Sequence, residues 1–124
     1  DISINELAMR PHNTGHWTQD GSVTSQFEQH LRAVLDLPLG AVDTLAPVTV
    51  MANVLGADED PAMPMPERVR EVMERYPQAK IHLYGKDHRP GRKIGHVNVT
   101  GGSTDETLSI ARQAAHFLVH ATWA

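Results

Sequence analysis

The sequence feature that most restricts the fold is the apolar run Val48–Leu55. Its eight residues carry no charge and are rich in β-branched side chains, which favour strands. Because the run is apolar throughout rather than at alternate positions, we expect a strand buried on both faces. Segments 79–84 and 93–100 are also typical of strands, with Ile81 and Leu83 on one face of the first. A sheet is therefore expected in the second half of the chain.

Helices are expected before, between and after these strands along the chain. Two Ser-x-x-Glu capping boxes, Ser25 with Glu28 and Ser103 with Glu106, mark the starts of two of them. A third helix is expected over 67–76, before Pro77. Apolar residues recur at helical spacing in these three segments, at Phe27, Leu31, Val34 and Leu35, at Val69, Val72, Met73 and Tyr76, and at Leu108, Ala111, Ala115, Leu118 and Val119. Because strands and helices alternate, the fold class is mixed α/β or α+β, and α+β is the class that we predict.

Composition excludes several classes of function. The net charge of −4 argues against nucleic acid and acidic membranes as partners, because both require a dominant positive field. The sequence contains no cysteine, which excludes a disulfide framework, a thiolate metal site and a cysteine nucleophile. No run approaches the roughly 18 apolar residues of a membrane span, and no signal peptide is visible. We therefore expect a cytoplasmic protein with one domain's worth of chain.

Polar and charged groups gather near the start of the chain, in Asn-Glu-Leu-Ala-Met-Arg-Pro-His-Asn-Thr-Gly-His-Trp over 5–17. Ile2-Ser3-Ile4 just before it is typical of a short strand, on which Asn5 and Glu6 would face opposite sides. The strand pattern breaks at Arg10-Pro11, and Gly15 supplies a flexible joint. A carboxylate at a strand end, followed by arginine and two histidines in a loop, has the composition of an active-site edge. A polar connection with incidental histidines is the alternative.

A second polar feature is the run Arg89-Pro90-Gly91-Arg92, which matches a type II turn with proline second and glycine third. Such a turn brings its first and fourth Cα atoms within about 7 Å. Lys86 and Lys93 flank it, and Asp87 is the one acid in the run. Because arginine binds phosphate or carboxylate in bidentate fashion, we interpret the turn as an anion site. A solvated basic turn is the alternative.

Segment 5–17 resembles the closing motif of the ATP-grasp ligases, in the form found in the 5-(carboxyamino)imidazole ribonucleotide synthases. That family reads close to Asn-Glu-Leu-Ala-Pro-Arg-Pro-His-Asn-Ser-Gly-His-Trp. This chain departs from it at Met9 and Thr14, and neither departure removes a charged or metal-binding group. The other segments that share the resemblance are 24–33, 37–40, 83–86 and 89–96. The resemblance therefore covers most of the chain, in order.

The resemblance implies that 1–40 ends an ATP-grasp domain and that 41–124 forms a small sandwich-like domain of strands with flanking helices. It implies an ATP-dependent ligase of purine biosynthesis that carboxylates aminoimidazole ribonucleotide with bicarbonate through carboxyphosphate. Because such a ligase needs a preceding domain, the chain is expected to be the C-terminal portion of a longer enzyme, inactive alone and a homodimer when complete. A transformylase-like ligase that uses formate and glycinamide ribonucleotide, and a phosphate-binding or regulatory module, are the alternatives.

The resemblance also implies roles for the residues that touch ATP and bicarbonate. Glu6 corresponds to an acidic Mg²⁺ ligand, and together with Asn5 it would contact ATP. The family's other acidic ligand is expected outside this chain, so any Mg²⁺ site here is half a site. Arg10 would stabilise bicarbonate or carboxyphosphate, and Lys86 would lie near the reacting carboxylate. Arg10 and Lys86 are thus the expected catalytic residues.

The remaining roles concern the ribonucleotide. Its expected ligands are His12, Asn13, Arg92, Arg89 and Lys93, with Arg92 the first choice for the 5′-phosphate. His96 belongs to the shared motif but receives no role. His116 and His120 have the i, i+4 spacing that can bind zinc, but the sequence shows no third ligand. We interpret that pair as the polar edge of an amphipathic helix.

Overall fold

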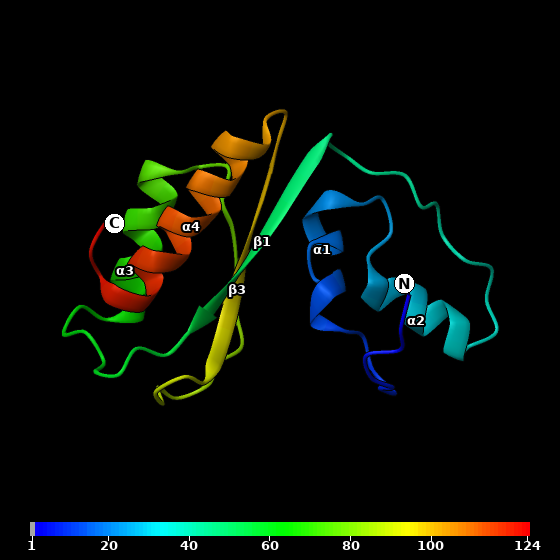
Figure 1. Ribbon diagram of the computed structural model, residues 1–124, viewed down its shortest axis with the longest axis horizontal. Helices are drawn as coiled ribbons and strands as arrows, with labels where there is room; N and C mark the ends of the chain where they lie inside the picture. Colours follow the sequence, from blue (N-terminus) through cyan, green and yellow to red (C-terminus); the bar gives the residue numbers. More distant parts are fainter. Residues whose placement is uncertain (1) are drawn as a thin grey trace. The chain divides into compact units, whose positions relative to one another are not determined.

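The structure, a computed structural model that describes residues 2–124, divides after Leu45 into two units. The sheet and the two longest helices belong to the second unit, Ala46–Ala124 (Figure 1). The first unit contains short helices and connecting segments. The assignment of 1–40 to an ATP-grasp domain and of 41–124 to a small second domain stays a prediction.

The second unit is built on strand β3 (Lys93–Gly101). It pairs antiparallel with β1 (Val48–Leu55) on one side and with β2 (Lys80–Leu83) on the other. The order β1-β3-β2 confirms the three predicted strands to within two residues. Because β3 is central, its apolar side chains are excluded from water, with Val97 0% and Val99 1% exposed. An antiparallel sheet combined with helices confirms the predicted α+β class.

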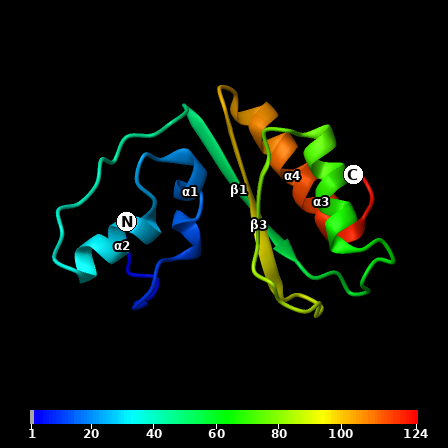
Figure 2. The ribbon, with the colours of Figure 1, turned by 180° about the vertical axis from the view of Figure 1, so that it is seen from behind.

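Both helices of the second unit lie on the same side of this sheet (Figures 1 and 2). Helix α4 (Thr104–His120) packs on β1 and β3, and α3 (Met65–Arg75) packs on α4. The apolar core fills the space between the layers and consists of Val54, Val72, Ala79, Ile94, Val97, Val99, Ala111, Ala114, Ala115, Phe117 and Leu118. Burial of these mainly aliphatic side chains is the principal force that holds the two layers together.

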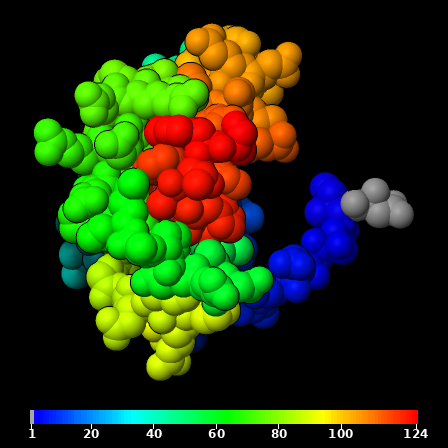
Figure 3. Space-filling model, turned by 90° about the vertical axis from the view of Figure 1, so that its left-hand side faces the viewer, coloured from blue at the N-terminus to red at the C-terminus, as the bar shows by residue number. Residues whose placement is uncertain are grey.

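The last residues of the chain close the helical layer. Ala121 adopts the left-handed conformation (φ 56°) that ends α4. Trp123 then stacks on Phe117 with ring centroids 4.1 Å apart and meets the Tyr76 ring edge-on at 5.7 Å. The Arg75 guanidinium lies 4.3 Å from the indole centroid. Figure 3 shows these C-terminal residues (red) against α3 (green). The aromatic contacts thus tie the chain end to α3.

Arg68, 3% exposed on α3, is the buried cation of the second unit. Its Nε donates to the Met63 carbonyl at 2.7 Å, and its Nη1 donates to the Leu118 carbonyl at 3.0 Å. Its Nη2 donates to Asp60 Oδ1 at 3.0 Å and to the Pro61 carbonyl at 3.2 Å. One side chain therefore fixes the loop before α3 and satisfies a carbonyl near the end of α4.

We expect Arg68→Leu to lower the free energy of unfolding by about 3 kcal/mol, because it removes the hydrogen-bond donor of buried carbonyls and of an acid. Urea unfolding of the chain measures the change. Asp60→Asn should cost under about 1 kcal/mol, since the Asp60 side chain is 54% exposed. Arg70→Leu, at an exposed position of the same helix, is the matched control. An equal loss in the two arginine variants would contradict a structural role for Arg68.

The first unit contains η1 (Asn13–Gly15), α1 (Thr18–Gly21) and α2 (Gln26–Val34). The Ser25 side chain accepts from the Glu28 N–H at 3.2 Å, which confirms the first predicted capping box. The apolar residues of α2 share a face, but Leu31 and Val34 are 61% and 68% exposed. Polar and backbone interactions therefore carry more of this unit's order than apolar burial does.

Two strand predictions are wrong. Residues 2–8 form no regular element, and Ile2 and Leu7 are 104% and 92% exposed. A strand needs a hydrogen-bonded neighbour, and the described residues provide none for this segment. Val48–Leu55 is a strand, but it is not buried on both faces, because it lies at an edge of the sheet and Leu55 is 44% exposed.

Three helix details also differ from expectation. Helix α3 begins at Met65 rather than at 67, with Pro64 as the preceding residue. Met73, expected to point inward, is 51% exposed. The second capping box does not form, since the Ser103 side chain makes no cap. Instead the buried Thr107 hydroxyl donates to the Ser103 carbonyl at 2.6 Å.

Candidate functional site

The predicted N-terminal site residues surround a shallow hollow in the first unit. Its volume is about 420 Å³, and its lining is Asn5, Glu6, Leu7, Ala8, Arg10, His12 and Thr14. Asn5 and Glu6 border the same hollow, so the expectation that they face opposite sides is wrong, because no strand forms here. Asn13 follows directly as the first residue of η1. The structure therefore brings Asn5, Glu6, Arg10 and His12 together.

Glu6 and His12 form the central polar contact of this hollow. His12 Nδ1 lies 3.2 Å from the Thr14 N–H, which donates to it, and 2.9 Å from the Thr14 hydroxyl. Since Nδ1 accepts, Nε2 carries the ring proton and faces the Glu6 carboxylate. The side chains are 38% and 46% exposed, so the pair is weak and screened. Glu6 thus remains accessible to a further ligand.

Gln26, which the sequence reasoning missed, holds this loop in place. Its Oε1 accepts from the His12 N–H at 3.1 Å, while its Nε2 donates to the His12 carbonyl at 2.7 Å and to His16 Nδ1 at 2.8 Å. A Cβ at Gly15 would collide with the Gln26 amide. Glycine at position 15 therefore leaves room for the Gln26 amide, and the interpretation of Gly15 as a flexible joint stays a prediction.

Gln26→Met keeps the side-chain length but removes these three hydrogen bonds. We expect hydrogen exchange at the His12 amide to accelerate about 10-fold, corresponding to about 1.4 kcal/mol of lost local stability. Gln29→Met is the matched control on the same helix, because Gln29 bonds to both backbone groups of Gly40 instead. Equal exchange at His12 in the two variants would refute the role of Gln26.

The basic turn has the geometry predicted for it. Gly91 has a positive φ of 69°, and the Arg92 N–H donates to the Arg89 carbonyl at 3.1 Å, as a type II turn requires. The turn docks on Gly56 at the end of β1 through Gly56 N–H to Arg92 carbonyl and Gly91 N–H to Gly56 carbonyl, both 2.8 Å. A Cβ at Gly56 would collide with the Arg89 carbonyl. The position of the turn is therefore fixed by the backbone.

The lysines and the arginines around this turn make different contacts. Lys86 and Lys93 each place their ammonium nitrogen 5.8 Å from the centroid of the Tyr84 ring. Arg92 Nη1 donates to the Asp87 carbonyl at 3.1 Å, and Arg89 is exposed. Burial and, secondarily, the charge of Lys86 lower the pKa of Lys93. The structure thus pairs the two lysines at Tyr84.

Lys86→Met removes one of the two causes that lower the pKa of Lys93. The pKa should rise toward its ordinary value without reaching it, because burial is the larger cause and remains. Titration of the Lys93 side chain by NMR measures the change. Lys80→Met, at an exposed lysine of β2, is the control. An unchanged or lower Lys93 pKa in Lys86→Met would show that the two charges do not interact.

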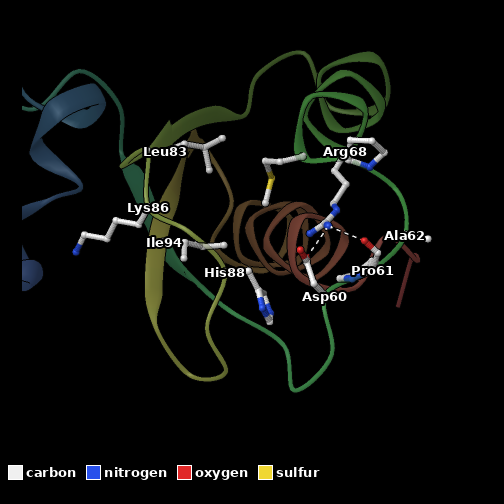
Figure 4. A pocket seen from close by; sticks show the side chains of 11 residues that line it. Asp60, Pro61, Ala62, Arg68, Leu83, Lys86, His88 and Ile94 are labelled. Carbon is white, nitrogen blue, oxygen red and sulfur yellow. Dashed lines mark hydrogen bonds and ion pairs between the residues drawn. The ribbon is translucent and has the colours of Figure 1, made fainter.

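A second hollow of about 420 Å³ lies beside the lysine pair, within the second unit (Figure 4). Its lining is Asp60, Pro61, Ala62, Pro64, Met65, Arg68, Leu83, Gly85, Lys86, His88 and Ile94. The Arg68 donors are occupied by the contacts described above, and His88 Nε2 is 2.9 Å from the Ala57 carbonyl. Figure 4 shows Lys86 turned away from Leu83 and Ile94. This hollow therefore does not gather the predicted anion ligands.

The metal predictions rest on few groups. Within residues 2–124, no cluster of three or more His, Cys, Asp or Glu side chains is placed to hold a metal ion. Glu6 with neighbouring Asn5 offers oxygen donors of the type that Mg²⁺ prefers, which fits one part of a coordination sphere. The His116 and His120 ring centroids are 4.6 Å apart.

Within residues 2–124, the helices are too short or too polar to cross a bilayer.

Comparison with known families decides where the chain belongs. Residues 49–110, half of the sequence, match the family described as phosphoribosylaminoimidazole carboxylase C-terminal domain. The chain belongs to this family. Residues 1–27 match the ATP-grasp domain. The family match thus covers most of the sheet unit, whereas the ATP-grasp match covers the segment that carries Glu6 and His12.

Curated relatives carry the same resemblance along nearly the whole chain. N5-carboxyaminoimidazole ribonucleotide synthase of Corynebacterium ammoniagenes is 64% identical over 123 residues, which is 99% of this chain and 30% of that protein. The synthase of Mycobacterium tuberculosis H37Rv is 60% identical over 122 residues, 98% of this chain and 28% of that protein. The chain therefore spans less than a third of the length of these relatives.

Solved structures agree with the fold. The synthetase of Thermotoga maritima matches with a TM-score of 0.76 and 40% identity, covering 94% of this chain and 32% of that one. The synthase of Aspergillus clavatus, solved with ADP and 5-aminoimidazole ribonucleotide, matches with a TM-score of 0.67 and 37% identity, covering 86% and 28%. The likeness to both structures confirms the fold class predicted from the sequence.

Proposed function

We propose that this chain is the C-terminal portion of an ATP-dependent ligase that carboxylates 5-aminoimidazole ribonucleotide with bicarbonate in purine biosynthesis. The two curated relatives reported above, at 60% and 64% identity, are named N5-carboxyaminoimidazole ribonucleotide synthase. The observation that carries the proposal is structural: Asn5, Glu6, Arg10 and His12 line one hollow of the first unit. A phosphate-binding module built on the basic turn alone would not need that hollow.

The N-terminal hollow would bind the phosphate chain of ATP and the bicarbonate-derived group. Glu6 would provide a carboxylate ligand to Mg²⁺, and Asn5 would contact ATP beside it. Bound Mg²⁺ would neutralise phosphoryl oxygens as charge moves between them. Arg10, exposed apart from a 3.3 Å bond to the Pro11 carbonyl, would bind the anionic carboxyphosphate. Its planar guanidinium matches the carboxylate end of that anion.

His12 and Asn13 would contact the ribonucleotide, and Lys86 would lie near its reacting end. Its 5′-phosphate would be bound by the cations after β2, with Arg92 first and Arg89 and Lys93 in support. The support for this assignment is charge: four cations within eight residues, a single acid and a backbone-fixed turn. Such a cluster favours a dianion.

The reaction proceeds in two steps. Bicarbonate attacks the γ-phosphate of ATP and gives carboxyphosphate and ADP. The amine of the ribonucleotide then takes the carboxyl group, and inorganic phosphate is released. Carboxyphosphate is short-lived in water, so the site must be closed during both steps. Both hollows of the chain are open, so the isolated chain should show no ligase turnover. We also propose a cytoplasmic location and a homodimer for the complete enzyme.

ADP release by the complete enzyme, with and without bicarbonate and ribonucleotide, tests the proposal. Glu6→Gln should lower kcat by about 100-fold or more, because it removes a charge that acts on the transferring phosphoryl group. Arg92→Ala should raise the ribonucleotide KM by about 10- to 100-fold, because it removes a charge-assisted hydrogen bond. Glu74→Gln and Arg70→Ala, at exposed positions of α3, are the matched controls.

The substrates that stimulate turnover discriminate between the alternatives. Stimulation that requires aminoimidazole ribonucleotide supports the synthase. Stimulation by formate and glycinamide ribonucleotide would overturn it in favour of the transformylase. ATP turnover under neither condition would remove the ligase assignment and leave the basic turn as a binding site. An unchanged ribonucleotide KM in Arg92→Ala would remove that residue from the phosphate site.

A further inference from the structure

His96 is a buried ionisable residue that the proposed mechanism leaves without a task. It lies on the central strand β3 and is 1% exposed. Its ring stacks on that of His82, its cross-strand partner, with centroids 4.6 Å apart and planes 14° from parallel. An ionisable side chain is rarely placed at such a position for packing alone, because an aliphatic residue would fill the space without a polar group to satisfy.

The partner of His96 on the side of the basic turn is Tyr84. The phenol Oη lies 2.6 Å from His96 Nδ1, a short hydrogen bond. Burial raises the pKa of Tyr84, so the phenol keeps its proton and is able to donate it to Nδ1. Because β3 fixes the His96 backbone and the Tyr84 N–H donates to the Ile94 carbonyl at 3.0 Å, this bond determines how the Tyr84 ring is turned.

The Tyr84 ring in turn contacts both lysines of the candidate anion site. Each ammonium nitrogen is 5.8 Å from the ring centroid, within the range of a cation–π interaction. Lys86 and Lys93 repel one another, so in the absence of an anion the aromatic ring is an attractive group that they share. The direction of the ring therefore sets where the two positive charges lie.

We propose that Tyr84 and His96 act as a positioning pair that holds Lys86 and Lys93 as one clamp for the ribonucleotide, with Lys93 toward its 5′-phosphate and Lys86 toward its reacting end. The proposal rests on the proposed function, in which these lysines face the ribonucleotide. The chain of contacts runs from the fixed strand to His96, from His96 to the phenol, and from the aromatic ring to the two ammonium groups. Neither Tyr84 nor His96 needs to touch the substrate.

A double-mutant cycle in the complete enzyme tests the pair. Tyr84→Phe keeps the ring and removes the hydroxyl, whereas His96→Leu removes the acceptor. Each variant should raise the ribonucleotide KM about 5-fold, because each removes one oriented hydrogen bond. The double variant should be no worse than either single variant, because both break the same bond. The KM for ATP should change less than about 2-fold, because the clamp contacts the ribonucleotide and not ATP.

A conservative replacement separates positioning from packing. His96→Asn places an amide oxygen near the position of Nδ1 and should restore most of the ribonucleotide KM, which a structural role alone does not predict. His116→Leu is the matched control, because its ring also lies 4.6 Å from another histidine ring. Unfolding midpoints of all variants are measured alongside. If His96→Leu does not fold, Tyr84→Phe and His96→Asn still carry the test.

The outcomes distinguish this inference from the function on which it rests. Lys86→Met and Lys93→Met should each raise the ribonucleotide KM. If both leave it unchanged, the lysines do not bind the ribonucleotide, and the roles proposed above for Lys86 and Lys93 fail. If they raise it while Tyr84→Phe leaves it unchanged, the positioning pair alone is overturned. Additive effects of Tyr84→Phe and His96→Leu would also overturn the pair, since independent effects exclude a shared bond.

Discussion

The pairing of β3 with both of its neighbours is the constraint on which the second unit depends. It places Val97 and Val99 against α4 and sets His82 opposite His96. It also brings the end of β1 to the start of β3, where Gly56 receives the basic turn. A shift of one residue in either ladder would exchange the two faces of β3. Core packing and the placement of the lysines therefore depend on one register.

The first unit has a different physical basis. Its larger apolar side chains are mostly exposed, including those on α2. Its order comes from hydrogen bonds that join distant residues, above all from the Gln26 amide to His12 and His16. Backbone bonds from Val23 to Asp43 and from Leu45 to Gly21 add a closed loop. Such a unit opens locally at a lower free energy than a packed core, as binding loops generally do.

The sequence was sufficient for features that depend on local chemistry. The three strands, the helix starting after Ser25 and the turn at Arg89 follow from periodicity, capping and proline–glycine spacing. It was insufficient where the outcome depends on a distant partner. Residues 2–8 carry a strand pattern without a neighbouring strand, Arg68 is buried because carbonyls of two segments surround it, and Gln26 acts across fourteen positions. The family resemblance supplied candidate site residues but not the groups that hold them in place.

The lysine pair shows that the sheet unit accepts an electrostatic cost at the candidate anion site. Because the pKa of Lys93 is lowered in the folded state, the charged lysine opposes folding at neutral pH, and this penalty is relieved as the pH rises toward the ordinary lysine pKa. The effect of Tyr84 on folding stability is the opposite. Its pKa is raised in the folded state, so its contribution to the free energy of unfolding is present at neutral pH and is lost as the pH rises through that pKa. A bound dianion would favour the charged lysines, because a nearby negative charge raises the pKa of a lysine. Cations that were only solvated would have no reason to include a partly buried lysine beside another.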